Sequence, residues 1–217
     1  MAVISIFLAA KSPSLVFSLM FVFLFFYFKR HKRLNAPIIM IMLVGILLIG
    51  RYQINTYLMN EDAARHLFFK YSAVTANNYF PLGSGFGTYG SAEAAKNYSS
   101  LYYLYGFNKS WGMSPEYGSF LTDTYWPQLI GQFGWIGFGL MIIIYLRLFM
   151  TFTNLNFGPL KRAFLYAAFA QFMVHGIGSA ILTSSSGMIG FATLALFTNT
   201  IVEKDSTFRI PKVRISL

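Results

Sequence analysis

The sequence contains no cysteine and unusually few charged residues. Its 217 residues include seven aspartates and glutamates and three histidines. The absence of cysteine excludes disulfides and thiolate metal sites. Charged residues make up 11% of the chain, whereas a soluble domain carries roughly a quarter. Together with 56% hydrophobic and 19% aromatic residues, this composition predicts an integral membrane protein.

Apolar stretches recur along the chain at lengths close to those that cross a bilayer. A spanning helix needs about 20 mostly apolar residues. Five stretches approach this length: Ser12–Phe28, Pro37–Ile54, Trp126–Phe149, Ala163–Ile181 and Gly187–Ile201. The sequence therefore predicts an all-α integral membrane protein with about five transmembrane helices and one large outer loop.

The basic residues cluster after alternate stretches, and this pattern predicts the topology. The clusters lie at residues 29–33, 147–162 and 204–214. With five alternating spans they fall on one side, which is cytoplasmic by the positive-inside rule. The formal charge of +10 is then a topology signal and calls for no nucleic-acid partner. An odd span number places the N-terminus outside, and we expect the chain to be the C-terminal part of a larger protein.

These predictions divide the chain into four parts. Residues 1–54 form the first two spans, 55–125 an extracytoplasmic loop, 126–203 the last three spans and 204–217 a basic cytoplasmic tail. Within the loop, apolar residues recur at helical spacing after Asn60, a favourable N-cap. We therefore predict an amphipathic helix over Glu61–Ala76.

A glycine-rich turn follows this helix and contains Gly83, Gly85 and Gly87. Residues 85–90 match the G-x-G-x-x-G pattern, but a dinucleotide site needs a preceding strand, and a helix is expected here. Two interpretations remain. The glycines provide the positive φ angles of a tight turn, or their backbone N–H groups approach a phosphate or sugar.

Four cations are candidates for binding a lipid-linked diphosphate at the outer membrane face. They are Lys11, Arg51, Arg65 and Lys70. Lys11 and Arg51 lie at the outer ends of the first two spans, where snorkelling to the interface is the alternative role. Arg65 lies four residues after Glu61, so a surface ion pair is its alternative.

Two carboxylates, Glu116 and Asp123, precede the third span. Either could accept a proton from a sugar hydroxyl, or simply cap the following helix. The aromatic residues Tyr89, Tyr102, Tyr103 and Trp111 could stack against sugar rings or anchor the loop at the membrane interface. His175 and Gln171, one turn apart in the fourth span, are more typical of a hydrogen bond between helices.

The order of these features resembles the O-antigen polymerase and O-antigen ligase family, in its C-terminal half. The matching positions are Lys11-Ser12, Arg65 on the loop helix, the turn Phe80–Gly90, and the entry to the next span, Asp123–Gly137. The tyrosine-rich tract after the turn is more similar to capsular and exopolysaccharide polymerases. Many ligases carry a histidine where Asp123 stands, and full-length members have about twice as many spans.

The resemblance implies a lipid-dependent, metal-independent glycosyltransferase without a cofactor. Its substrate would be a polyprenyl-diphosphate oligosaccharide, polymerised into envelope or capsular polysaccharide at the outer face of the bacterial plasma membrane. Its partners would be membrane lipid and other polysaccharide export and assembly proteins. In this scheme Asp123, or else Glu116, is catalytic, and the four cations, the three glycines and Trp111 bind substrate. Two alternatives are a transporter or flippase fragment for lipid-linked sugars and a non-catalytic membrane subunit of an assembly complex.

Overall fold

The structure, a computed structural model, describes residues 12–31, 34–53, 55, 59–60, 63–154 and 157–199. The described part of the chain contains helices and no strands, which confirms the predicted all-α class. Its α-helices are α2 (Ser12–Arg30), α3 (Ala36–Gln53), α4 (Ala64–Asn78), α5 (Ala92–Lys96), α6 (Ser100–Leu104), α7 (Tyr125–Asn154), α8 (Pro159–His175) and α9 (Ser185–Asn199). Two short 3₁₀ helices, η2 (Phe107–Lys109) and η3 (Ile181–Thr183), complete it.

Each of the five apolar stretches forms a helix, namely α2, α3, α7, α8 and α9. Within the described residues, one helical segment, Tyr125–Thr153 in α7, is long and apolar enough to cross a membrane. The number of five spans therefore stays a prediction. The fourth stretch was predicted to run to Ile181, but α8 ends at His175. Gly176 follows as its C-cap, consistent with the low helix propensity of glycine.

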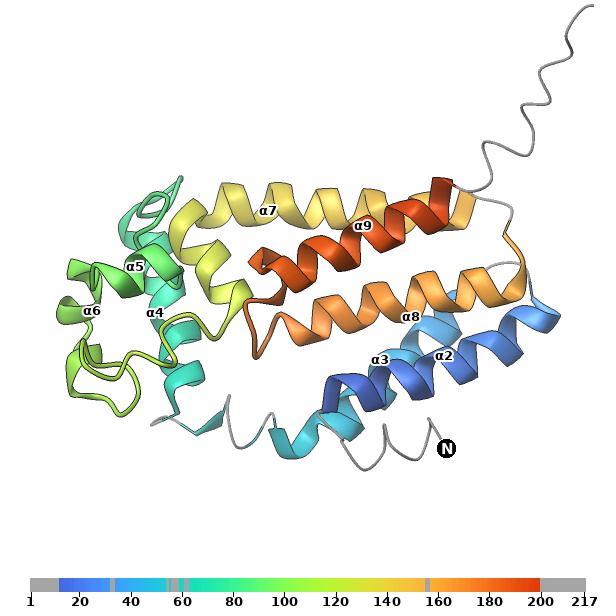
Figure 1. Cartoon of the computed structure of the whole chain (residues 1–217), viewed down its shortest axis with the longest axis horizontal. Helices are drawn as coiled ribbons and strands as arrows, with labels where there is room; N and C mark the ends of the chain where they lie inside the picture. The colour runs from blue at the N-terminus through green and yellow to red at the C-terminus, as the bar shows by residue number, and fades with distance from the viewer. Residues whose placement is uncertain are drawn as a thin grey trace, which may run out of the picture.

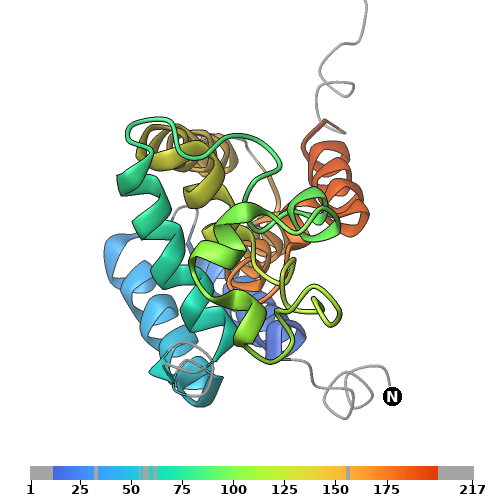
Figure 2. The same cartoon turned by 90° about the vertical axis from the view of Figure 1, so that its left-hand side faces the viewer.

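The five helices lie lengthwise beside one another, and α4, α5 and α6 gather at one end of the molecule (Figure 1). The C-terminal end of α2, the N-terminal end of α8 and the C-terminal end of α9 lie at the opposite end. Figure 2 looks onto the end that carries α4, which crosses it and packs against α7. The basic C-terminal end of α2 and the basic N-terminal end of α8 are therefore remote from α4, α5 and α6.

Small residues let α2 and α8 pack closely. Ala163 and Ala167 of α8 are fully buried, and Ala170 packs against the same core. The three alanines therefore form a close-packed face of α8. On the α2 side, the ring of Phe28 stacks on that of Tyr166 at 5.6 Å between centroids. Helix contacts of this kind are typical of helices that associate through small residues.

Helix α7 bends sharply at Gly134, which has φ 62° and ψ −166°. The bend brings the hydroxyls of Tyr125 and Tyr145 to 2.7 Å from each other. In a straight helix, residues twenty positions apart are separated by about 30 Å, so the first segment of α7 must fold back. The predicted continuous span from Trp126 is thus interrupted. The segment after Gly134 is still about 30 Å long, which matches a bilayer core.

The long segment between α3 and α7 has a hydrophobic core of its own. Eight of its residues are buried together: Phe68, Tyr89, Ala94, Leu101, Tyr102, Phe107, Met113 and Leu121. We call residues 63–123 with this core the loop unit. Most of its rings meet edge-to-face or tilted, as with Phe68 and Tyr89 at 5.3 Å, and those of Tyr102 and Phe107 stack; both are favourable aromatic geometries. The segment predicted to be a large outer loop is therefore a folded unit that can hold side chains in fixed positions.

Candidate functional site

Arg65 and Asp123 form an ion pair that joins the two ends of the loop unit. Arg65 donates hydrogen bonds from Nε and Nη2 to Oδ2 of Asp123, at 3.1 and 2.6 Å. The two side chains are 25% and 27% exposed, so the pair is reachable from solvent. Among the candidate cations and carboxylates that the structure describes, these two are the ones that it brings into direct contact.

The pair is positioned by the ends of three helices. Arg65 lies in the first turn of α4, which begins at Ala64 with Ala63 as N-cap. The predicted Asn60 cap is therefore wrong, since α4 begins three positions after the predicted start at Glu61 and its N-cap is Ala63. The Asn60 carbonyl accepts from the Ala63 N–H. Glu61, the alternative partner of Arg65, lies outside the described residues.

The C-terminal turn of α8 provides the third side of this site. Arg65 Nη2 also donates to the Gly178 carbonyl at 3.3 Å, just beyond the end of α8. Carbonyls beyond a helix C-terminus carry partial negative charge and attract cations. A Cβ at Gly178 would lie 3.4 Å from Cζ of Arg65, so a side chain there would press on the guanidinium. The absence of a side chain at Gly178 thus suits the position of Arg65.

Asp123 is fixed by the start of α7. The Tyr125 N–H donates to the Gly176 carbonyl at 3.0 Å, and Trp126 Nε1 donates to the Met173 carbonyl at 3.1 Å. These bonds tie the entry of α7 to the end of α8. Among the described residues, Oδ1 of Asp123 accepts no hydrogen bond, since both donors of Arg65 reach Oδ2. One carboxylate oxygen is therefore held by Arg65, while the other can accept a proton or a hydrogen bond from a hydroxyl group.

The other predicted cations that the structure describes, Arg51 and Lys70, do not join this pair. Lys11 lies outside the described residues, and Arg51 is exposed in the last turn of α3. Lys70 is exposed with its Nζ 5.7 Å from the centroid of the Tyr71 ring. Five positions along a helix correspond to a rotation of about 140°, so Lys70 and Arg65 leave α4 on different sides. A four-cation diphosphate site is therefore not assembled by the described residues.

The glycine-rich turn packs on the bend of α7. Gly83, Gly85 and Gly87 all have positive φ, at 77°, 101° and 77°, as the tight-turn interpretation requires. The N–H groups of Ser84 and Gly85 donate to the carbonyls of Gly131 and Gln132 at 3.0 Å each. The Gly83 N–H likewise donates to the Tyr79 carbonyl.

Those three N–H groups are already used within the protein, which weakens the phosphate interpretation for this part of the turn. The dinucleotide interpretation fails as well, because α4 rather than a strand precedes the turn. A substrate-binding role for the three glycines stays a prediction. What the structure explains is their conformation and their fit against α7.

For two of the four aromatic residues, the predicted role of stacking against sugar rings is wrong. Tyr89 and Tyr102 are fully buried in the core of the loop unit. Tyr89 donates its hydroxyl proton to the Phe68 carbonyl, and the Tyr102 hydroxyl accepts from the Gly90 N–H, both at 2.8 Å. Burial raises the pKa of both hydroxyls well above the ordinary value. These rings hold the unit together and cannot meet a sugar.

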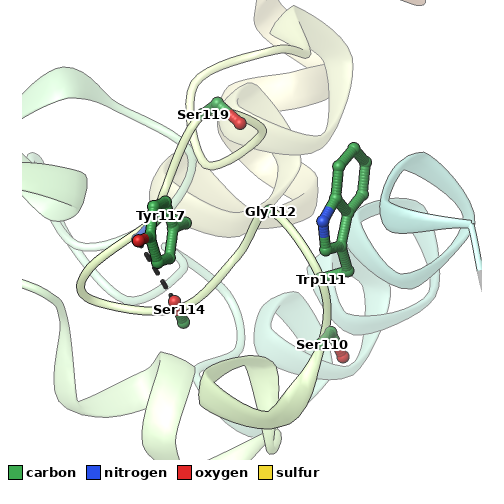
Figure 3. Close-up of a pocket in the computed structure, with 6 residues that line it drawn as sticks. All are labelled: Ser110, Trp111, Gly112, Ser114, Tyr117 and Ser119. Carbon is green, nitrogen blue, oxygen red and sulfur yellow. Dashed lines mark hydrogen bonds between the residues drawn. The ribbon is translucent and has the colours of Figure 1, made fainter.

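Trp111, in contrast, is 86% exposed and lines a pocket. The hollow measures about 330 Å³ and is lined by Ser110, Trp111, Gly112, Ser114, Tyr117 and Ser119. Figure 3 shows the rings of Trp111 and Tyr117 on either side of the backbone at Gly112. Glu116 is exposed within this same segment. The pKa of the Tyr98 hydroxyl is raised to about 12, first by burial and then by the nearby charges of Tyr103 and Glu116.

Glu116 and Asp123 therefore occupy different surroundings. Glu116 is exposed and lies in sequence between the pocket residues Ser114 and Tyr117, whereas Asp123 belongs to the ion pair with Arg65. Sequence reasoning did not select Gly178 or Tyr117 as site residues. Gly178 contributes a backbone carbonyl, which no side-chain pattern indicates. Tyr117 could have been noticed, since it lies six positions after Trp111 in the same polar segment.

Comparison with known proteins adds no relative to this description. No family model, curated protein or solved structure matches the chain.

Proposed function

We propose that the protein polymerises polyprenyl-diphosphate-linked oligosaccharide repeats into envelope or capsular polysaccharide. The observation that supports this function best is the Arg65–Asp123 pair. Both residues were selected from the sequence on independent grounds, and they form an ion pair although 58 positions separate them in the chain. The pair also lies where the loop unit joins α7, the helix with the length and apolarity of a membrane span. A substrate with a lipid tail and a polar head would reach such a position from the membrane surface.

The chemistry requires charge stabilisation and removal of one proton. The acceptor hydroxyl attacks the anomeric carbon of the donor, the bond between that carbon and the diphosphate oxygen breaks, and the polyprenyl diphosphate leaves with the electron pair. In this scheme Asp123 accepts the hydroxyl proton on Oδ1, the oxygen to which none of the described residues donates. A carboxylate so placed acts as general base.

Arg65 would serve both the base and the leaving group. Its Nε and Nη2 orient Asp123 through Oδ2, and its positive charge lies beside the reacting groups. Preorganised donors aimed at developing negative charge are among the strongest contributions to catalysis. Arginine suits this double role because its planar guanidinium presents several donors in a fixed geometry.

The proposal is tested by polymerisation of the native lipid-linked repeat by membranes that carry Arg65 variants. We expect Arg65→Ala to abolish elongation, and Arg65→Lys to restore only part of it, since an ammonium cannot donate in the same fork. Lys70→Ala is the matched control, since it removes an exposed cation from the same helix and should leave elongation unchanged. Full elongation by Arg65→Ala would refute the proposal, and transport without elongation in the wild type would favour a transporter.

A further inference from the structure

We infer that the pocket between Trp111 and Tyr117 is a binding subsite for a neutral sugar residue of the glycan chain. We call residues Ser110–Phe120 with this hollow the aromatic pocket. The inference rests on the proposed function only for the source of the sugar, which would be the lipid-linked repeat or the growing chain.

Exposure sets these two rings apart from most other aromatics of the loop unit. Trp111 is 86% and Tyr117 is 76% exposed, whereas Phe68, Tyr89, Tyr102 and Phe107 are completely buried. Leaving a large aromatic surface in water forgoes about 1.5–3 kcal/mol of burial free energy per side chain. Two such rings around one hollow are more typical of a binding site than of a random surface.

The lining chemistry favours a carbohydrate. Its six residues are uncharged and combine two aromatic rings with the hydroxyls of Ser110, Ser114 and Ser119. Serine hydroxyls both donate and accept hydrogen bonds, as sugar hydroxyls do, and an aromatic face attracts the C–H groups of a pyranose ring. A diphosphate would instead need cations, and none lines the hollow.

The pocket is also preorganised. Gly112 has φ 74°, and a Cβ there would lie 2.3 Å from the Phe120 ring. The Phe120 N–H donates to the Gly112 carbonyl at 2.9 Å, and the Phe120 ring lies against that of Trp111 at 5.3 Å. The Tyr117 N–H donates to the Ser114 carbonyl and to its hydroxyl, the latter drawn in Figure 3. A backbone held in this way loses little entropy when a ligand binds.

The size of the pocket suits a short part of a glycan. Its volume of about 330 Å³ is at the lower end of the range for small-molecule sites. The pocket therefore fits one or two sugar residues, and the remainder of the chain would extend into solvent. Neither Arg65 nor Asp123 is among its lining residues, so the pocket would hold the glycan rather than react with it.

The test is binding of the purified full chain, in detergent micelles, to a printed array of bacterial mono- to hexasaccharides. We expect the wild type to bind at least one class of glycan. Trp111→Ala and Tyr117→Ala should each lower that signal at least tenfold, and Trp111→Phe should keep part of it. The matched control is Tyr79→Ala, which removes an aromatic ring that is 46% exposed outside the pocket and should bind as the wild type does. Near-ultraviolet circular dichroism checks that each variant is folded.

Three outcomes would overturn the inference: a blank array for the folded wild type, equal signals for wild type and Trp111→Ala, or a blank array together with a Trp111-dependent fluorescence shift on phosphatidylglycerol vesicles. The last would make the aromatic pocket a membrane contact. Failure of the proposed function looks different. A wild-type chain that binds the array through Trp111 but elongates no lipid-linked repeat would refute the enzyme and leave the subsite standing.

Discussion

At the residue scale, the glycines of the turn differ in what they need. An added Cβ at Gly83 would lie 2.4 Å from the Gly134 nitrogen and 2.7 Å from the Gln132 carbonyl. An added Cβ at Gly85 meets only the Thr88 methyl group, at 4.0 Å. Gly83 therefore combines a positive φ with a close approach to α7, whereas at Gly85 the positive φ is the main constraint.

We expect alanine substitutions at these two positions to differ in stability. Gly85→Ala should cost about 1 kcal/mol through its backbone conformation. Gly83→Ala should cost about 2–4 kcal/mol, because backbone atoms of α7 must also move. Thermal unfolding in detergent measures the difference, with Gly139→Ala as control, since nothing lies within 4 Å of the Cβ there. Equal losses at Gly83 and Gly85 would contradict the observed packing of the turn.

The tyrosines show what a sequence leaves open at this scale. Tyr89, Tyr102 and Tyr103 share one residue type and one polar segment, yet the first two are fully buried and Tyr103 is 56% exposed. Composition cannot separate a ring that fills a core from one that meets a ligand. The separation depends on long-range packing against Phe68, which sequence spacing does not specify. Arg65 and Asp123 could be selected because charged residues in a mainly apolar chain are few.

At the scale of elements, hydropathy located the five long helices because each is a nearly continuous apolar stretch. It failed where a helix is ended or bent by glycine. The end of α8 before Gly176 and the bend of α7 at Gly134 were both missed, because glycine also occurs within straight membrane helices. The bend depends on the glycine-rich turn, some fifty positions away, that packs against it.

The bend of α7 can be tested by crosslinking, because the chain has no native cysteine. In the Tyr125→Cys/Tyr145→Cys variant, we expect a short bis-maleimide to join the two thiols, since the native hydroxyls are 2.7 Å apart. A straight helix would separate them by about 30 Å, beyond the reach of the reagent. Mass spectrometry of the peptide pair detects the product. Tyr125→Cys/Leu140→Cys is a control for nonspecific reaction, and absence of a crosslink specific to position 145 would contradict the bend.

At the scale of the whole molecule, the charges and the loop unit lie at opposite ends. Lys29 and Arg30 end α2, and Lys161 and Arg162 begin α8, at the end remote from α4–α6 (Figure 1). This separation agrees with the alternation that the positive-inside pattern assumes. It fits our proposal that the loop unit and the ion pair face the outer side of a bacterial plasma membrane.

Topology can be measured with single cysteines in this cysteine-free chain. We expect Ser91→Cys in the loop unit to react with an impermeant thiol reagent in intact cells. Asn35→Cys, which is in the connection between α2 and α3, should react only after the cells are permeabilised. Permeabilised cells are the control for accessibility at both positions. Labelling of Asn35→Cys in intact cells would reverse the proposed orientation.

The central claim is that Asp123, held by Arg65, accepts the proton of the attacking hydroxyl, and the polymerisation rate of Asp123→Asn tests it most directly. Asparagine keeps the size and a hydrogen-bonding oxygen but removes the basicity. Loss of a general base typically slows a reaction by about 10²–10⁴-fold. The matched control is Glu116→Gln, which removes an exposed carboxylate that is not part of the ion pair. The account predicts that Asp123→Asn binds the lipid-linked donor normally but elongates it at least a hundredfold more slowly, while Glu116→Gln keeps the wild-type rate. Long polysaccharide made at the normal rate by Asp123→Asn would contradict it.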